Sequence, residues 1–297
     1  MPSVLVNGLS LEYESFGRDT DPCVLLVMGL GTQLTAWPVS LCEALVDRGY
    51  RVIRFDNRDV GLSTRLAHAG APRVPLIATL RLLGLPVRVP YQLEDMASDA
   101  IGLMDALDID RAHVVGASMG GMIAQLMAGH HAHRVLSLTS IMSTTGHRSL
   151  PGPDAKARRA LLMKPDDPQD MSSVQRRNMT VRRTLESPSY RQSDESLEKM
   201  VSDALARGGY DPAAAARHLA AVLASGHRRA LLAGVTVPSL VLHGEADILV
   251  KPACGRDTAD CLPNSRFVTF PGMGHDLPEA LMPEWAQLID ETATRAA

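Results

Sequence analysis

The sequence has few of the features that mark nucleic-acid-binding or membrane-binding proteins. Only 4% of its 297 residues are Phe, Trp or Tyr, so aromatic platforms for base stacking are not expected. Its 30 Lys and Arg residues are balanced by 33 Asp and Glu residues, which leaves a net charge of −3. Because nucleic acids and anionic membranes attract strongly basic faces, neither partner is expected.

No apolar stretch is long enough to cross a bilayer. The longest nearly apolar run, residues 114–129, is shorter than the roughly 18–20 residues that a membrane-spanning helix needs. It also contains Ser118 and Gln125. Residues 1–8 lack a basic segment followed by an apolar one, so no signal peptide is expected. These absences predict a soluble protein.

Cysteine is scarce, and its spacing indicates neither a disulfide framework nor a metal site. The four thiols are those of Cys23, Cys42, Cys254 and Cys261. None of them forms a Cys-x-x-Cys pair, and a histidine cluster at residues 130–133 has no carboxylate beside it. We therefore expect no bound metal and four reduced thiols, which fits a cytoplasmic protein.

What the sequence does contain is an alternation of short apolar runs with longer amphipathic segments. An Asn-Gly pair at residues 7–8 predicts a hairpin turn between two short strands. Strands are expected at residues 4–6, 9–13, 23–28, 51–55, 113–116, 135–138, 237–243 and 266–270. Helices are expected at residues 37–48, 93–107, 119–129 and 281–292. This alternation predicts an α/β fold with a mostly parallel sheet and helices on both faces.

One long segment interrupts the alternation. Residues 143–230 contain no good strand run and show helical periods, which predicts an inserted helical cap between core segments 1–142 and 231–297. The segment holds 15 of the 30 Lys and Arg residues and 10 of the 33 Asp and Glu residues, so it carries +5 while −8 remains elsewhere. These charges are either solvated helix faces or a basic cap that docks on an acidic core.

The strongest chemical signal is Gly-Ala-Ser-Met-Gly-Gly at residues 116–121. It follows an expected strand and opens an apolar helix. In such a sharp strand-to-helix turn the serine adopts a strained backbone conformation, and the flanking glycines let strand and helix approach closely. Ser118 is therefore the candidate nucleophile, held at the carboxyl end of the sheet where open α/β sheets bind ligands.

A serine hydroxyl needs a base and an orienting acid to become a nucleophile. His275 lies in a glycine-rich loop directly after the last expected strand, which is a position that presents its side chain at the sheet edge without burying it. Asp247 follows the preceding strand and is succeeded by apolar residues that can bury it. Glu245 is the rival acid, and Asp247 is preferred because it lies deeper in the loop. The order Ser118, Asp247, His275 is the order of α/β hydrolases.

Catalysis also needs donors for the negative charge that develops on the substrate carbonyl oxygen. The backbone N–H of Met119, directly after the candidate nucleophile, is one expected donor. The other should come from residues 28–33 after the third strand, and we nominate the N–H of Leu30. Gly29 or Gly31 could equally place this second donor.

Five segments spread over nearly the whole chain resemble the α/β-hydrolase superfamily. They are Val-Met-Gly-Leu-Gly at 27–31, Phe-Asp-Asn-Arg-Asp-Val-Gly-Leu-Ser at 55–63, Gly-Ala-Ser-Met-Gly-Gly at 116–121, His-Gly-Glu-Ala-Asp at 243–247 and Gly-Met-Gly-His at 272–275. Within the superfamily the chain is similar to capped bacterial carboxylesterases such as aclacinomycin methylesterase. The resemblance implies an eight-stranded sheet and ester hydrolysis through an acyl-enzyme without a cofactor.

The expected function is therefore that of a serine carboxylesterase acting on small to medium esters. Another reaction on the same three residues is the first alternative: perhydrolysis of the haloperoxidase type, C–C bond hydrolysis or aminopeptidase activity. A non-catalytic binding protein that retains the fold is the second. The expected partner is a small-molecule ester, and a homodimer is possible.

Overall fold

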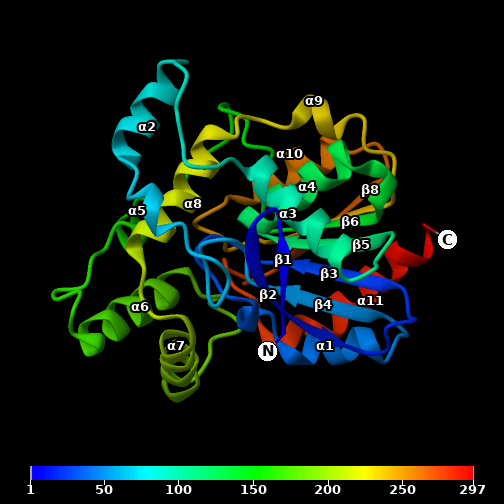
Figure 1. Ribbon diagram of the computed structural model, residues 1–297, viewed down its shortest axis with the longest axis horizontal. Coiled ribbons are helices and arrows are strands. Elements are labelled where there is room, and N and C mark those ends of the chain that lie inside the picture. The colour runs from blue at the N-terminus through cyan, green and yellow to red at the C-terminus, as the bar shows by residue number, and fades with distance from the viewer. Residues whose placement is uncertain (1, 297) are drawn as a thin grey trace.

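The apolar runs of the sequence form one eight-stranded sheet in a computed structural model that describes residues 2–296 (Figure 1). The strand order is β1-β2-β4-β3-β5-β6-β7-β8. Strand β2 pairs antiparallel with β1 and with β4, and the pairs from β4 through β8 are parallel. The bounds are β1 Ser3–Val6, β2 Leu9–Phe16, β3 Cys23–Val27, β4 Arg51–Phe55, β5 Ala112–Ala117, β6 Val135–Ile141, β7 Ser239–Gly244 and β8 Ser265–Phe270. The prediction of a mostly parallel, eight-stranded sheet is confirmed.

Helices cover both faces of this sheet, so its central strands are buried along their whole length. Every residue of β3, β4 and β5 is buried. Two hydrophobic clusters lie on opposite faces. Helices α3, α4 and α10 pack on one face and α1 and α11 on the other, as Figure 1 shows. Their bounds are α1 Val39–Val46, α3 Leu93–Ala106, α4 Met119–His130, α10 Pro252–Cys261 and α11 Met282–Thr294.

The N-terminal hairpin forms where the Asn-Gly pair predicts it. Asn7 and Gly8 have φ angles of 51° and 79°, the left-handed values that a two-residue hairpin turn requires. The turn sets the register of β1 against β2, in which Val6 lies opposite Leu9. All four cysteines are free thiols.

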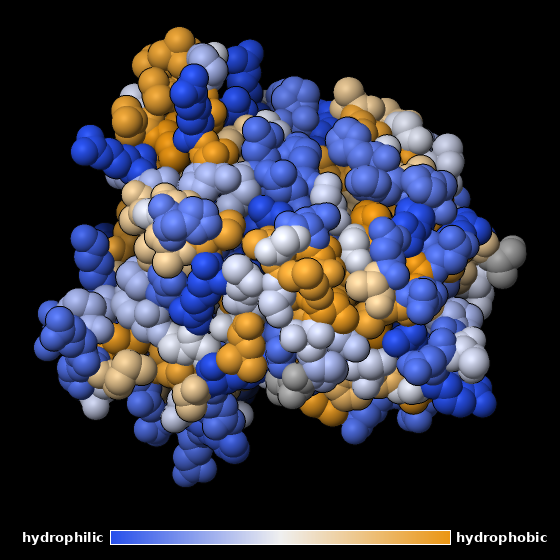
Figure 2. Space-filling view, viewed as in Figure 1, coloured by the Kyte–Doolittle hydropathy of each residue, from blue (hydrophilic) through white to orange (hydrophobic). Residues whose placement is uncertain are grey.

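Between β4 and α3 the structure contains a helix that the sequence analysis did not predict. Helix α2, Val74–Leu82, projects from the body of the molecule beside α8 (Figure 1). Its apolar residues lie on several sides rather than on one face, so the helix lacks the periodic pattern by which the others are recognised. Ile77 is buried, whereas Leu82 and Leu83 are 87% and 65% exposed. Figure 2 shows the apolar surface that results on this projection.

Four helices between β6 and β7 form a group that we call the helical segment. In Figure 1 the group lies beyond the edge of the sheet to which the parallel strands point. Its helices are α5 Ala155–Leu161, α6 Met171–Leu185, α7 Asp194–Gly208 and α8 Pro212–Ala224. Three of them begin at a side chain that accepts hydrogen bonds from the first turn, namely Asp170, Ser193 and Asp211. The short helix α9, Arg229–Leu232, follows and contacts α4 and α10.

Two buried ion pairs join the helical segment to the loop after β4. Arg207 Nη1 donates to Asp56 Oδ2 over 2.7 Å, and Arg217 forms two bonds of 2.7 and 2.8 Å with the Asp59 carboxylate. Asp59 and the Arg217 side chain are almost completely buried. Among residues 2–296 there is no helix with the length and apolar character needed to cross a membrane.

Candidate active site

Ser118 lies at the turn between β5 and α4 with a φ of 56° and a ψ of −118°. This is a strained conformation for a residue with a side chain, and it directs the serine away from the helix it precedes. Two glycines permit it. A Cβ at residue 116 would lie 2.1 Å from the carbonyl oxygen of Gly120, and a Cβ at residue 120 would lie 2.0 Å from that of Val27. Only glycine, which has no side chain, fits at either position, and this allows the predicted elbow at residues 116–121 to form.

His275, in the loop after β8, places its imidazole against this serine. Its Nε2 lies 3.0 Å from Ser118 Oγ and its Nδ1 lies 2.7 Å from Asp247 Oδ2. A carboxylate only accepts hydrogen bonds, so the neutral ring carries its proton on Nδ1 and turns the Nε2 lone pair toward the hydroxyl. The three predicted side chains, which are up to 157 residues apart in sequence, are brought together at one edge of the sheet.

The prediction that the loop would leave the His275 side chain unburied is wrong. Its side chain is only 8% exposed, because the end of α6 covers the loop. The His275 N–H donates to the Leu185 carbonyl over 2.8 Å, and Gly274 packs against the Leu185 and Glu186 carbonyls. A glycine-rich loop gives no local sign of a cover that is supplied from 90 residues earlier in the chain.

Asp247 is buried after β7 and is oriented by the backbone. Its Oδ1 accepts hydrogen bonds from the N–H groups of Leu249 and Val250, over 2.8 and 2.9 Å. Burial raises the pKa of Asp247, but the positive charge that His275 carries once protonated and the hydrogen bonds of His243 and His275 outweigh this effect, and the pKa lies well below its ordinary value. The carboxylate is therefore ionised. The rival, Glu245, is exposed and accepts a hydrogen bond from Thr269 instead.

A second histidine, to which no role was assigned from the sequence, touches Asp247. His243 is fully buried at the end of β7, with Nε2 2.7 Å from the Val250 carbonyl oxygen and 3.5 Å from Asp247 Oδ2. It braces the loop that carries the carboxylate. Its position four residues before Asp247 was visible in the sequence, but the backbone contact that orients it was not.

The loop after β3 runs beside Ser118. A Cβ at Gly29 would lie 3.2 Å from the Cβ of Ser118, so the two backbones are in close contact there. The N–H of Gly31 is engaged, because it donates to His218 Nδ1 over 3.0 Å. Within residues 2–296 no acceptor is found for the N–H groups of Leu30 or Met119. Of the donors considered, the N–H groups of Leu30 and Met119 are thus unengaged within this range, as is that of Gly29, whereas the N–H of Gly31 is bound to His218.

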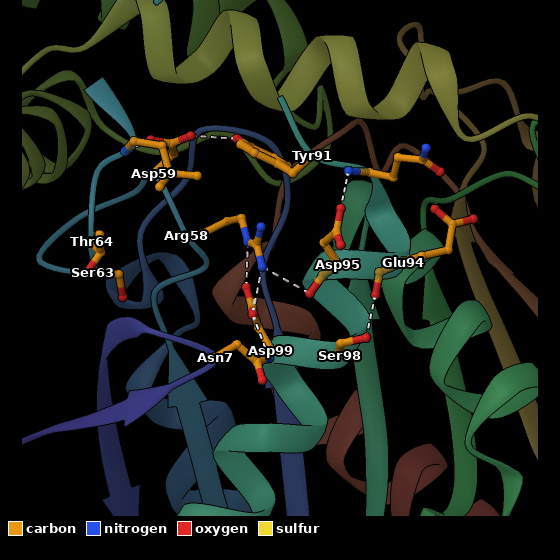
Figure 3. A network of polar contacts seen from close by, with 12 residues as sticks. Asn7, Arg58, Asp59, Ser63, Thr64, Tyr91, Glu94, Asp95, Ser98 and Asp99 are labelled. Atoms are coloured by element: carbon orange, nitrogen blue, oxygen red, sulfur yellow. Dashed lines mark hydrogen bonds and ion pairs between the residues drawn. The ribbon is translucent and has the colours of Figure 1, made fainter. Parts of the chain in front are cut away.

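The loop after β4 supports this arrangement, and the sequence analysis noted its motif without assigning it a role. Asn57 donates to the Met28 carbonyl over 2.9 Å, and Asp56 Oδ1 accepts from the N–H of Leu34 over 2.7 Å. Figure 3 shows the next part of the loop, where Arg58 forms two bonds of 2.6 and 2.7 Å with Asp99 of α3. These bonds tie the loop after β3 to the rest of the sheet edge.

Asp59 completes the network (Figure 3). It accepts from the Tyr91 hydroxyl over 2.7 Å and pairs with Arg217 of the helical segment. Burial raises the pKa of Asp59, but its bonds to Arg217, Leu66 and Tyr91 outweigh the effect and lower it. The polar residues at the start of this motif thus join the loop after β4 to the loop after β3, to α3 and to the helical segment.

The family profile described as "alpha/beta hydrolase fold" matches residues 22–279. The chain belongs to the α/β-hydrolase family. Two curated relatives of this α/β hydrolase are the rhodomycin D methylesterases of Streptomyces sp. strain C5 and Streptomyces peucetius. Each is 29% identical, over 100% of this chain and 99% of the relative. The resemblance to the α/β-hydrolase superfamily and to bacterial methylesterases is confirmed.

Solved structures show the same fold. The enol-lactonase of Burkholderia xenovorans LB400 superposes with a TM-score of 0.69 at 24% identity, covering 99% of both chains. The meta-cleavage product hydrolase of Pseudomonas fluorescens IP01 superposes with a TM-score of 0.75 at 18% identity, covering 100% of this α/β hydrolase and 98% of that chain. At these identities the comparison establishes architecture alone.

Proposed function

We propose that this α/β hydrolase is a serine carboxylesterase that cleaves small to medium carboxylic esters through an acyl-enzyme on Ser118. The observation that carries the proposal is the unbroken hydrogen-bond chain from Ser118 through His275 to Asp247. A neutral serine is a weak nucleophile, and this chain supplies both the base that takes its proton and the carboxylate that stabilises the imidazolium formed.

The reaction follows from the roles of these three residues. Ser118 Oγ attacks the ester carbonyl carbon while its proton moves to His275 Nε2, which gives a tetrahedral oxyanion. The intermediate collapses, the C–O bond to the alcohol breaks, and the alcohol leaves with the proton from Nε2. Water then adds to the acyl-enzyme with His275 as base, and the carboxylic acid is released as the serine recovers its proton.

The oxyanion would be bound by the N–H groups of Leu30 and Met119. Both belong to loops held close to Ser118, and both lack an acceptor within residues 2–296. Preorganised donors of this kind stabilise the charge that appears only as the carbonyl is attacked. No metal or organic cofactor is needed for this chemistry.

We further propose that residues 143–230 act as a cap over the reaction centre. The support is the contact between α6 and the His275 loop, together with the buried ion pairs of Arg207 and Arg217 with the loop after β4. The names of the two Streptomyces relatives, both methylesterases, make methyl esters the first substrates to test.

The test combines turnover with active-site labelling. The wild type should hydrolyse p-nitrophenyl acetate and butyrate and react with a fluorophosphonate, whereas Ser118→Ala should lose labelling and at least about 10³-fold in kcat. Ser149→Ala is a matched control, because Ser149 Oγ also bonds a histidine, His147 Nδ1, over 2.7 Å, but lies exposed away from this centre. It should retain full activity.

Two outcomes would contradict the proposal. A wild type that leaves these esters and methyl esters untouched is not a carboxylesterase, and faster turnover of amides or formation of peracids would point to the alternative reactions on the same residues. Failure of the fluorophosphonate to label Ser118 would favour a non-catalytic binding protein.

A further inference from the structure

His218 is a fully buried histidine that links the helical segment to the loop after β3. It lies in the middle of α8, and both of its ring nitrogens are engaged by backbone groups of the sheet edge. Its Nδ1 accepts from the Gly31 N–H over 3.0 Å, and its Nε2 donates to the Arg58 carbonyl over 2.7 Å. The reaction proposed above assigns no role to this residue.

These two bonds fix the tautomer of the ring. The Gly31 N–H can only donate, so Nδ1 carries no proton, and the Arg58 carbonyl can only accept, so Nε2 carries one. Burial lowers the pKa of His218, which outweighs the bond to the Arg58 carbonyl and the charge of Asp59. The ring is therefore neutral, with its acceptor committed to the loop after β3.

That bond acts on the peptide next to the proposed oxyanion donor. The Leu30–Gly31 peptide is held at both ends, because its N–H bonds to His218 and its carbonyl accepts from Thr32 Oγ1 over 3.1 Å. In the preceding peptide the Gly29 carbonyl accepts from the Thr32 N–H over 3.3 Å. Because a trans peptide is planar, fixing that carbonyl directs the Leu30 N–H to the opposite side.

The histidine is itself held in place. The neighbouring Arg217 is bound to Asp59, which anchors α8 on the sheet edge. The carbonyl that accepts the hydrogen bond from its Nε2–H belongs to Arg58, whose guanidinium is bound to Asp99. A Cβ at Gly31 would lie 3.7 Å from the Cβ of Ala215, so the helix passes close to the loop. His218 thus connects the anchored helix α8 to the loops after β3 and β4.

We propose that His218 is a positioning residue, which holds the Gly31 N–H so that the Leu30 N–H points toward the oxygen of the ester carbonyl. The proposal rests on the esterase function proposed above. It assigns to the helical segment a direct part in transition-state stabilisation, in addition to covering the site. It also gives the reason why Leu30 rather than Gly31 would be the second donor.

Two conservative variants separate the two bonds of the ring. In His218→Asn the side-chain oxygen takes the place of Nδ1 and can accept from Gly31, but nothing reaches the Arg58 carbonyl. In His218→Gln the side-chain nitrogen takes the place of Nε2 and can donate to Arg58, but the acceptor for Gly31 is lost. Both variants are polar and differ by one methylene, so their effects on folding should be similar.

We expect the two variants to differ in kcat. His218→Gln should lose about 10- to 100-fold in kcat on p-nitrophenyl butyrate with KM within about 3-fold, because a misdirected donor costs less than the 10²- to 10³-fold of a deleted one. His218→Asn should stay within about 3-fold of the wild type. His113→Gln is the control, since His113 is buried against Ser137 at the other end of β5. It should lower stability while kcat is preserved.

The outcomes distinguish this proposal from the function on which it rests. Equal kcat values for the Asn and Gln variants, or a loss in His113→Gln as large as in His218→Gln, would overturn the positioning role while Ser118-dependent turnover of the wild type stands. Absence of Ser118-dependent turnover in the wild type would remove both proposals. Urea unfolding of each variant shows that the comparison is made between folded proteins.

Discussion

Replacing Asp247 with asparagine tests the acid of the proposed triad with little change of shape. Oδ1 of Asp247 accepts from two backbone N–H groups, so the oxygen of the new amide must occupy that position. The amide nitrogen is then forced toward His275 Nδ1, where the carboxylate oxygen stood 2.7 Å away. Since an amide nitrogen donates, Nδ1 has to accept, and the ring proton moves to Nε2.

The tautomer produced in Asp247→Asn is inactive as a base. With a proton on Nε2, His275 has no lone pair directed at Ser118 Oγ, and the imidazolium formed during the reaction loses its counter-charge. A carboxylate-to-amide change in a serine triad lowers kcat by about 10⁴-fold. We expect a loss of about 10³- to 10⁴-fold here, which corresponds to about 4–5.5 kcal/mol of transition-state stabilisation.

The assay is steady-state hydrolysis of p-nitrophenyl butyrate by the wild type and Asp247→Asn, with Glu245→Gln as control. Glu245→Gln should keep its activity, because Glu245 is exposed and bonded to Thr269. Retention of kcat within about 10-fold by Asp247→Asn would refute the reasoning about the tautomer. Equal losses in both variants would refute the choice of Asp247 over Glu245.

The same pair of proteins should differ in acid stability. The pKa of Asp247 is lowered in the folded state, so its ionised carboxylate stabilises the fold at pH values above its ordinary pKa of about 3.9. That contribution is lost as the pH falls from there through the lowered pKa. The difference in unfolding free energy between wild type and Asp247→Asn, measured in urea, should therefore shrink as the pH is lowered below about 4.

Two further predictions concern stability. Arg217→Met should lower the free energy of unfolding in urea by about 3–5 kcal/mol, because it leaves the buried Asp59 carboxylate without its counter-charge. Arg176→Met is the control and should change this free energy little, because the Arg176–Asp170 pair is exposed. Equal effects of the two substitutions would contradict the importance of burial. Gly120→Ala should fail to fold stably, because its Cβ would lie 2.0 Å from a backbone oxygen. Gly152→Ala is the control: its Cβ would lie in open space, so the melting temperature should not change.

Sequence reasoning worked where the signal is local. The strands of the sheet are short apolar runs, and Arg51–Phe55 has the bounds that its pattern predicts. The elbow at residues 116–121 was visible because closeness of strand and helix demands glycine at fixed spacing. For His275 and Asp247 the chain order and the position after a strand were enough to nominate residues that the structure brings within hydrogen-bond distance.

The rest of the site is built from contacts that leave no local pattern. His218 lies in an alanine-rich helix, and its two bonding partners, Gly31 and Arg58, lie 187 and 160 residues earlier in the chain. The cover over His275 comes from Leu185, and Asp56 gains its partner from Arg207. Helix α2 was missed for a different reason, since its apolar residues do not follow the period of an amphipathic helix.

The wide spacing of the buried ion pairs has a consequence for biosynthesis. Asp56 and Asp59 leave the ribosome 151 and 158 residues before Arg207 and Arg217. Protein synthesis proceeds at about 5–20 residues per second, so the two arginines are made about 8–30 seconds after the carboxylates with which they pair. During that interval the nascent loop after β4 has to stay hydrated, so the first half of the sheet edge acquires its final form only when the second half of the chain has been made.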